Sequence, residues 1–430
     1  MVRELKHTEI GDIPVDWEIQ TFEETFKILS NNTLSRENLN NRDGAVRNIH
    51  YGDVLTQFSE VLKCNDEEIP YINDLSLLSS STQLLQDGDT IIADTAEDET
   101  VGKATEIQGL GNGKLVAGLH TIPCRVKKGE FAPGWHGYYM NSHMYHDQII
   151  PYITGIKVSS ISKSAVAETL ILIPSKEEQE AIVKSLQDVD LLILSLEKEI
   201  AKKKNIKYGV LQSYVTGKRR IDGFSSKWEE KTIDELCTLV TKQTGFDYSA
   251  EIKPSLVEVH YSNTLPFLQN KDFAGYSINY NTDFYIPTEV AYKYPKIFLD
   301  NICLLISISG RIGNVAMFNH DRDAFVGGAV GVAKFKNPEL VEWTMLYLMG
   351  TDGQKQIFEN EKAGAQHNLT VEDVRHLTIP IPGDDERKAI TAMMSDIEED
   401  IIHLEHKLEK YKMLKQGMMS DLLTGKIRLV

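Results

Sequence analysis

The sequence predicts an α+β protein made of two mixed α/β domains, each followed by one long helix, in an internal repeat. The last part of each half matches the other at a constant offset, and this matched part carries the apolar pattern of a long helix. The rest of each half mixes short β-rich runs with helix-like patches. At 430 residues the chain is too long for one ordinary domain. We therefore expect domains at 1–173 and 222–381 and long helices at 174–221 and 382–430.

The two mixed domains match each other loosely. "VDWEIQTFEETF" at 15–26 resembles "SKWEEKTIDELC" at 226–237, which places Trp17 opposite Trp228. "GDTIIADTAEDETVGKA" at 88–104 resembles "DNICLLISISGRIGNVA" at 300–316, an apolar run followed by a polar loop. "WHGYYM" and "WTMLYL" form a third match. These matches predict that both domains share one fold.

The two helix segments match much more closely, and without a gap. Pro174, Glu178 and Leu196 meet identical residues at Pro382, Glu386 and Leu404. The phrase Thr-Gly-Lys-x-Arg then ends both segments, at 216–220 and 424–428. Such self-similarity indicates duplication of a structural unit, with a period far longer than that of a solenoid.

Both helix segments have readable ends. Ser175 is the expected N-cap of the first, and Glu178 three residues later completes a capping box. Gly217 and Gly425 stand where a left-handed C-terminal cap is expected, and the basic residues after them suit the negative end of the helix dipole.

Apolar residues inside both segments alternate at spacings of three and four. This pattern is a narrow seam, typical of coiled-coil pairing, and two seams in one chain can satisfy each other. A helix of ~42 residues would be ~60 Å long. A single copy would suit an ordinary core helix, but two register-matched copies favour a paired helical spacer. The seam positions are Ile182, Leu186, Val189, Ile193, Leu196, Ile200, Ile390, Met394, Ile397, Ile401, Leu404 and Leu408.

No catalytic or cofactor motif stands out. The Gly-Lys of the repeated phrase is not a phosphate-binding loop, because Gln212 and Ser420 occupy the position of its first glycine. We find no Asn/Asp-Pro-Pro-aromatic motif for methyl transfer, and "GLGNGK" at 109–114 is better explained as a turn. The histidines of "HMYH" at 143–146 lack the spacing of a metal site. We expect no catalytic residue, metal or cofactor in this chain.

Bulk properties favour a cytoplasmic globular protein. No apolar run approaches the roughly 18–20 residues of a membrane span, and no secretory signal is visible. The four scattered cysteines read as buried residues in a reducing compartment. The net charge of −17 argues against a generic nucleic-acid binder, although residues 200–221 carry seven bases and no acid.

The order of domain, "IPSKEEQEAI" helix, "TGKRRI", domain, "IPGDDERKAI" helix and "TGKIRL" resembles a type I restriction–modification specificity subunit. "IGDIPVDWE" near the N-terminus is typical of the same family. The resemblance covers essentially the whole chain and is strongest over 170–221 and 378–430.

The resemblance implies a DNA-binding protein that takes part in defence against foreign DNA. Each domain would be a target recognition domain that reads one half of a split, asymmetric site in double-stranded DNA. The helices would pair antiparallel about a pseudo-twofold axis and set the spacing. Two methylation subunits and restriction subunits would dock and bring S-adenosylmethionine, ATP and Mg.

Several residues have the chemistry to reach base edges or phosphates. In the second domain they lie in "SGRIGNVAMFNHDR" at 309–322, which a solvated hairpin would explain equally well. His367 and Asn368 would lie at the DNA edge or only cap the second helix. The candidates for DNA binding are Arg36, Arg42, Arg47, Lys103, Arg311, Asn314 and Arg322.

Two other interpretations stay open at this point. The first is a non-catalytic scaffold or dimerisation protein whose helices pair between chains and whose domains bind protein. The second is a self-contained methyltransferase, which would require cofactor binding by this chain. The basic strip at 202–207 would be a solvated helix face, a DNA-backbone contact or a docking site for an acidic partner surface.

Overall fold

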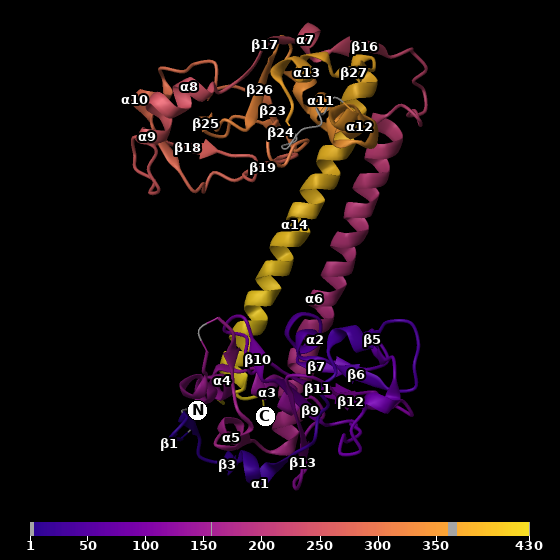
Figure 1. Ribbon diagram of the computed structural model, residues 1–430, viewed down its shortest axis with the longest axis vertical. Coiled ribbons are helices and arrows are strands. Elements are labelled where there is room, and N and C mark those ends of the chain that lie inside the picture. The colour runs from indigo at the N-terminus through magenta and orange to yellow at the C-terminus, as the bar shows by residue number, and fades with distance from the viewer. Residues whose placement is uncertain (1–3, 156, 360–367, 430) are drawn as a thin grey trace. The chain divides into compact units, whose positions relative to one another are not determined.

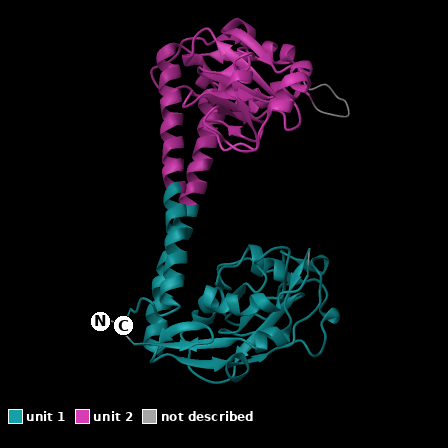
Figure 2. Ribbon diagram, turned by 90° about the vertical axis from the view of Figure 1, so that its left-hand side faces the viewer, with its two compact units in different colours: residues 1–197, 406–430 teal, residues 198–405 magenta. Residues whose placement is uncertain are grey.

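The computed structural model describes residues 4–155, 157–359 and 368–429 (Figure 1). The chain forms two compact units, one of residues 1–197 and 406–430 and the other of residues 198–405 (Figure 2). Each unit contains one mixed domain and one part of each long helix. The first unit therefore holds both ends of the chain.

The first domain contains a five-stranded and a four-stranded sheet. The central strand β9 is buried along its whole length, in keeping with the apolar run Ile91–Ala93. The five-stranded sheet has the order β4 (Phe26–Ile28), β13 (Thr121–Val126), β9 (Thr90–Ala93), β11 (Ala104–Gln108) and β7 (Val61–Lys63). The second has the order β12 (Leu115–Ala117), β6 (Arg47–Ile49), β8 (Tyr71–Ile72) and β5 (Leu39–Asn40).

The second domain repeats this topology. Its first sheet has the order β17 (Cys237–Lys242), β26 (Val330–Phe335), β23 (Cys303–Ser307) and β24 (Val315–Phe318). Its second sheet has the order β21 (Tyr285–Pro287), β18 (Thr264–Leu268), β25 (Ala324–Val326) and β22 (Phe298–Leu299). The pairs β12–β6 and β18–β25 are both parallel, whereas most neighbouring strands are antiparallel. The predicted internal repeat is therefore confirmed in the order and direction of the strands that the domains share: β4, β13, β9 and β11 match β17, β26, β23 and β24, and β12, β6 and β8 match β25, β18 and β21. The edge strands β5, β7 and β22 are not repeated among the described residues.

A two-stranded antiparallel ribbon joins each domain to its long helix. Strand β3 (Glu18–Thr21) pairs with β15 (Leu170–Ile173), and β16 (Glu229–Thr232) pairs with β27 (Thr378–Ile381). In both ribbons a strand near the start of the domain pairs with the strand that leads into the helix. The chain therefore enters and leaves each domain at one place.

The long helices are α6 (Lys176–Val210), extended by a π-type turn at Leu211–Val215, and α14 (Asp384–Leu422). Within the second unit, Lys203 and Lys207 form ion pairs of 2.5 Å with Asp400 and Glu398. The partner numbers fall as the lysine numbers rise, so the helix segments run antiparallel. Ion pairs from α14 to α6 show the same direction in the first unit, where Lys415 pairs with Asp190 and Lys412 with Glu197.

Three lysines of the basic strip at 202–207 have partners within the chain. Lys203, Lys204 and Lys207 each face a carboxylate of α14 in the same chain. The more exposed pairs of Lys203 and Lys204 contribute only about 0.2–1 kcal/mol each, so they favour one register more than they add stability.

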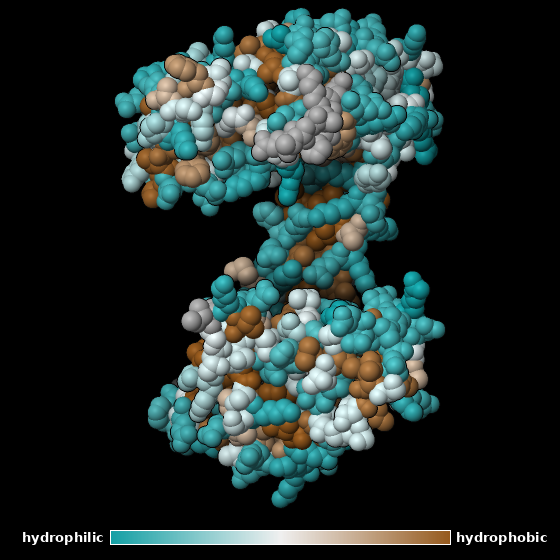
Figure 3. Space-filling view, viewed as in Figure 1, coloured by the Kyte–Doolittle hydropathy of each residue, from teal (hydrophilic) through white to brown (hydrophobic). Residues whose placement is uncertain are grey.

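The seam supplies the apolar contact between the helix segments. All twelve predicted seam positions are buried or half-buried. Figure 3 shows apolar side chains gathered between the two long helices. In each unit the two helix segments of a single chain thus cover each other's apolar seam, which disfavours pairing between chains. None of the described helices is both long and apolar enough to cross a membrane.

Candidate nucleic-acid interface

A buried glutamate lies at the start of each long helix. Glu178 on α6 is 0% exposed and Glu386 on α14 is 2% exposed. The indole of Trp17 donates a hydrogen bond of 3.0 Å to Glu178, and Trp228 donates one of 2.9 Å to Glu386. These two tryptophans are the ones that the loose repeat aligned, so each pair ties the start of a domain to the start of a helix.

The arginine of the repeated Thr-Gly-Lys-x-Arg phrase completes each site. Arg220 donates from Nε and Nη2 to the two oxygens of Glu386, at 2.6 and 2.5 Å. Arg428 binds Glu178 in the same bidentate way and also contacts Asp16. The phrase at the end of one long helix therefore binds the start of the other. We call each tryptophan–glutamate–arginine set a helix junction.

The glycines of the phrase pack against the same tryptophans. Gly217 and Gly425 have φ of +71° and +72°, so both predicted left-handed caps are confirmed. A Cβ atom on Gly217 would lie 3.1 Å from the Trp228 ring, and one on Gly425 would lie 2.4 Å from Pro14. Both the backbone angle and this close approach favour glycine.

The helix junctions correct two details of the sequence interpretation. Ser175 does cap α6 by accepting a hydrogen bond of 3.2 Å from the Glu178 amide. The Glu178 side chain, however, binds Trp17 and Arg428, so the predicted capping box is wrong. The arginines likewise reach the start of the opposite helix, because a buried carboxylate offers a stronger partner than a helix dipole.

Charge balance governs the ionisation of Glu386. Burial alone would raise its pKa, but the hydrogen bonds from Arg220 and Trp228 and the charge of Arg220 outweigh burial and leave the pKa lowered. The hydrogen bonds to Glu386 and its charge raise the pKa of Arg220. Both groups are therefore charged near neutral pH.

In the first domain, three of the predicted DNA-binding residues make contacts within the protein. Arg36 forms an ion pair of 2.5 Å with the buried Asp53. Arg47 donates to the carbonyl of Cys64 at 2.8 Å, and Lys103 donates to the carbonyl of Leu55 at 2.9 Å. Burial lowers the pKa of Lys103.

Arg42 differs from these three residues. It lies exposed in a turn, and its guanidinium has no hydrogen bond, ion pair or ring contact with any described residue. Arg47 also lines a polar hollow of about 400 Å³ beside Tyr71 and the turn at 109–114. The interpretation of "GLGNGK" as a turn is confirmed, since it connects β11 to β12.

In the second domain, Asn314 and Arg322 are likewise engaged. The Asn314 amide donates to the carbonyls of Asn270, at 3.0 Å, and Phe273. The Arg322 guanidinium lies 4.8 Å from the centre of the Tyr280 ring. Arg311 is exposed, and Asn368 pairs with Ser309 in an isolated bridge. His367 lies outside the described residues.

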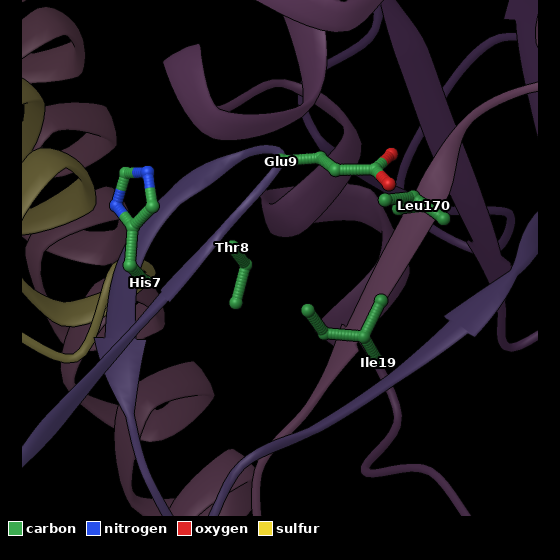
Figure 4. Close-up of a pocket in the computed structure, with 5 residues that line it drawn as sticks. All are labelled: His7, Thr8, Glu9, Ile19 and Leu170. Carbon is green, nitrogen blue, oxygen red and sulfur yellow. The ribbon is translucent and has the colours of Figure 1, made fainter.

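A hollow of about 640 Å³ in the first unit is lined by His7, Thr8, Glu9, Ile19 and Leu170. Figure 4 shows the Glu9 carboxylate beside Leu170 and the His7 ring on the opposite side of the hollow. No group of three or more His, Cys, Asp or Glu side chains in the described ranges is arranged to hold a metal ion.

Two domains with a shared strand frame, each tied by a helix junction to antiparallel helix segments, define a duplicated protein. The type I restriction modification DNA specificity domain matches residues 14–207 and 225–411. The chain belongs to this family and is a type I specificity subunit.

Two relatives are similar to this chain over much of their length. A Methanocaldococcus jannaschii protein, assigned as the MjaX type I restriction enzyme specificity subunit, is 25% identical over 442 residues, covering 99% of this chain and 96% of the relative. The MjaVIII specificity subunit of the same organism is 24% identical over 293 residues, covering 64% of this chain and 66% of the relative.

The fold is shared with two chains of known structure. One comes from a study of complex assembly and conformational transition in a type I restriction–modification system, with a TM-score of 0.59, 14% identity and coverage of 96% of this chain and 99% of that one. The other is the S subunit of M. genitalium, with a TM-score of 0.54, 12% identity and coverage of 98% and 99%.

Proposed function

We propose that this chain is a non-catalytic adaptor whose two domains each read one half of a bipartite, asymmetric site in double-stranded DNA. The helices set the distance between the half-sites. Methylation subunits and restriction subunits dock on the chain and supply the chemistry, with S-adenosylmethionine, ATP and Mg bound on those partners. The complex acts in the cytoplasm.

The observation that carries this proposal is the contrast between a repeated frame and unlike loops. Both domains share strand order, and both are tied to the helices through the same three side chains. The loop between β9 and β11 nevertheless carries Glu97, Asp98 and Glu99, whereas the loop between β23 and β24 carries Arg311. Equivalent loops with different side chains suit two different half-sites, because base edges are read by donors and acceptors.

The acidic balance of the chain bears on how it binds DNA. A net charge of −17 opposes phosphate binding by the chain alone. We therefore expect tight, sequence-specific binding only from the complex with methylation subunits. Equal specific affinity of the isolated chain and the complex would contradict this part of the proposal.

The proposal is tested by methylome sequencing of a host that carries this chain together with its methylation subunits. The expected result is methylation at a two-part motif with unspecified bases between the parts. A host with the methylation subunits but without this chain is the control, and it should lack that motif. A continuous motif, or one that persists in the control, would contradict the proposal.

A further inference from the structure

Most arginines in this acid-rich chain are committed to partners within the protein. Among the described arginines, only Arg42 and Arg311 have side chains with no hydrogen bond, ion pair or ring contact. A guanidinium is always charged and offers five donors, so a chain with this excess of carboxylates could readily pair it. Arg311 is therefore a candidate for binding a partner outside the chain.

The backbone that carries Arg311 is held in place from several sides. The Ser307 hydroxyl donates to the Arg311 backbone carbonyl at 2.6 Å and accepts a hydrogen bond from the Asn314 backbone N–H at 2.8 Å. The Asn270 side chain donates to the Ser309 carbonyl at 2.8 Å, and the Asn314 side chain donates back to Asn270. A fixed loop loses little entropy on binding, so it positions an exposed side chain at low cost.

Two glycines turn the chain on either side of this arginine. Gly310 and Gly313 have φ of +76° and +82°, a conformation that few other residues adopt readily. Asn368 pairs with Ser309 on the same loop. Arg311 thus lies at the tip of a loop, and the residues on both sides of it form hydrogen bonds within the domain.

A second polar group without a partner lies at the same edge of the domain. Ile308 donates to the carbonyl of Ala329 at 2.9 Å, which places the turn at 327–329 beside the loop. A Cβ atom on Gly328 would lie 3.3 Å from the side-chain oxygen of Gln243. Gln243 is 3% exposed, and neither atom of its side-chain amide has a hydrogen-bond partner among the residues that the structure describes. A buried amide without hydrogen bonds is energetically unfavourable. This edge of the domain therefore carries polar groups whose hydrogen-bonding capacity is not used within the described residues.

We propose that Arg311 is a specificity-determining residue of the second domain and donates two hydrogen bonds to the O6 and N7 atoms of a guanine in the major groove. Arginine with guanine is the commonest specific pairing of a side chain with a base, and the rigid loop suits its bidentate geometry. This proposal rests on the proposed function, since it names a base that the second domain reads.

The first domain offers an internal contrast. Its equivalent loop ends in the same turn, because the amides of Gly102 and Gly313 donate to the carbonyls of Ala93 and Ser307, the last residues of β9 and β23. Two residues before the glycine, however, the first domain has Thr100, whose hydroxyl donates to Asp98. A change at Arg311 should therefore affect only one half of the recognised site.

The test compares Arg311→Ala, Arg311→Lys and the control Arg42→Ala, which removes the other unpaired guanidinium. Each variant is assembled with the methylation subunits, and the methylated motif is determined by methylome sequencing. Arg311→Ala should relax one guanine in one half-site, with discrimination at that base reduced about 5- to 150-fold. Arg311→Lys should also lose discrimination, because a lysine keeps the charge without the bidentate geometry. Arg42→Ala should leave that half-site unchanged.

Three results would overturn the inference. The first is a motif unchanged at every base in Arg311→Ala. The second is an equal loss of methylation across all sequences, with full recovery in Arg311→Lys, which identifies a phosphate contact. The third is relaxation of both half-sites. Absence of a bipartite motif for the native complex would instead contradict the proposed function itself. Because the Arg311 side chain has no partner among the described residues, thermal melting of all three variants should match that of the native chain. If Arg311→Ala fails to fold, Arg311→Lys provides the test instead.

Discussion

At the scale of single residues, the two helix junctions explain why identical side chains recur far apart in the sequence. Glu178 binds Trp17 and Arg428, and Glu386 binds Trp228 and Arg220. The repeat revealed that these residues match, but it could not reveal that they meet. Each arginine follows one helix and binds the start of the other, a contact over more than 150 residues of sequence.

Replacement of either buried glutamate should destabilise its own unit. Glu386→Gln leaves Arg220 without its buried carboxylate and should cost about 3–5 kcal/mol of the free energy of unfolding. Hydrogen exchange measured along the chain should show the loss in residues 198–405. Asp385→Asn, an exposed neighbour in the same helical turn, is the control and should change stability by less than about 0.5 kcal/mol. Equal effects of the two substitutions would argue against the helix junction.

The lowered pKa of Glu386 gives its contribution a defined pH dependence. The pKa in the folded protein lies below that of an unfolded glutamate, about 4.3. The stabilisation is therefore fully present above that value and is lost as the pH falls through the folded pKa. Denaturant titrations of the native chain and Glu386→Gln from pH 7 to pH 3 should show their difference shrinking at acid pH. A constant difference would contradict this assignment.

At the scale of elements, the sequence predicted what depends on local pattern. The long helices and the seam could be predicted because apolar spacing is a local property, and Ile401 is 4% exposed as expected. The glycine caps at 217 and 425 were likewise predictable from the residue type. Strand order was not, since the pairing of β9 with both β11 and β13 depends on contacts between distant segments. The engaged state of Asn314 and Lys103 was also invisible, because exposed and bonded polar residues look alike in a sequence.

Adjacent isoleucines on α14 offer a matched test of the seam. Ile401 is 4% exposed and Ile402 is 42% exposed. Ile401→Ala should lower the free energy of unfolding by about 2–5 kcal/mol, whereas Ile402→Ala should cost less than about 1 kcal/mol. Chemical denaturation of both variants measures the difference. Similar losses would show that the seam does not carry the stability of this helix pair.

At the scale of the whole molecule, duplication is the feature from which the proposed function follows. Each compact unit takes its domain from one half of the chain and its helix segments from both halves. The frame repeats in strand order, in the ribbons that enter the helices and in the helix junctions. The loops that follow β9 and β23 do not repeat, so the two domains present different loops on a shared frame of strands.

The most direct test of this account replaces residues 226–381 of the second domain with a second copy of residues 15–173 of the first, which keeps the equivalent tryptophan and ribbon. The chain is assembled with its methylation subunits, and the methylated motif is compared with that of the native complex. The account predicts a bipartite palindrome in which both halves equal the half-site of the first domain. Retention of the native asymmetric motif, or loss of the first half-site while the complex still methylates DNA, would contradict it.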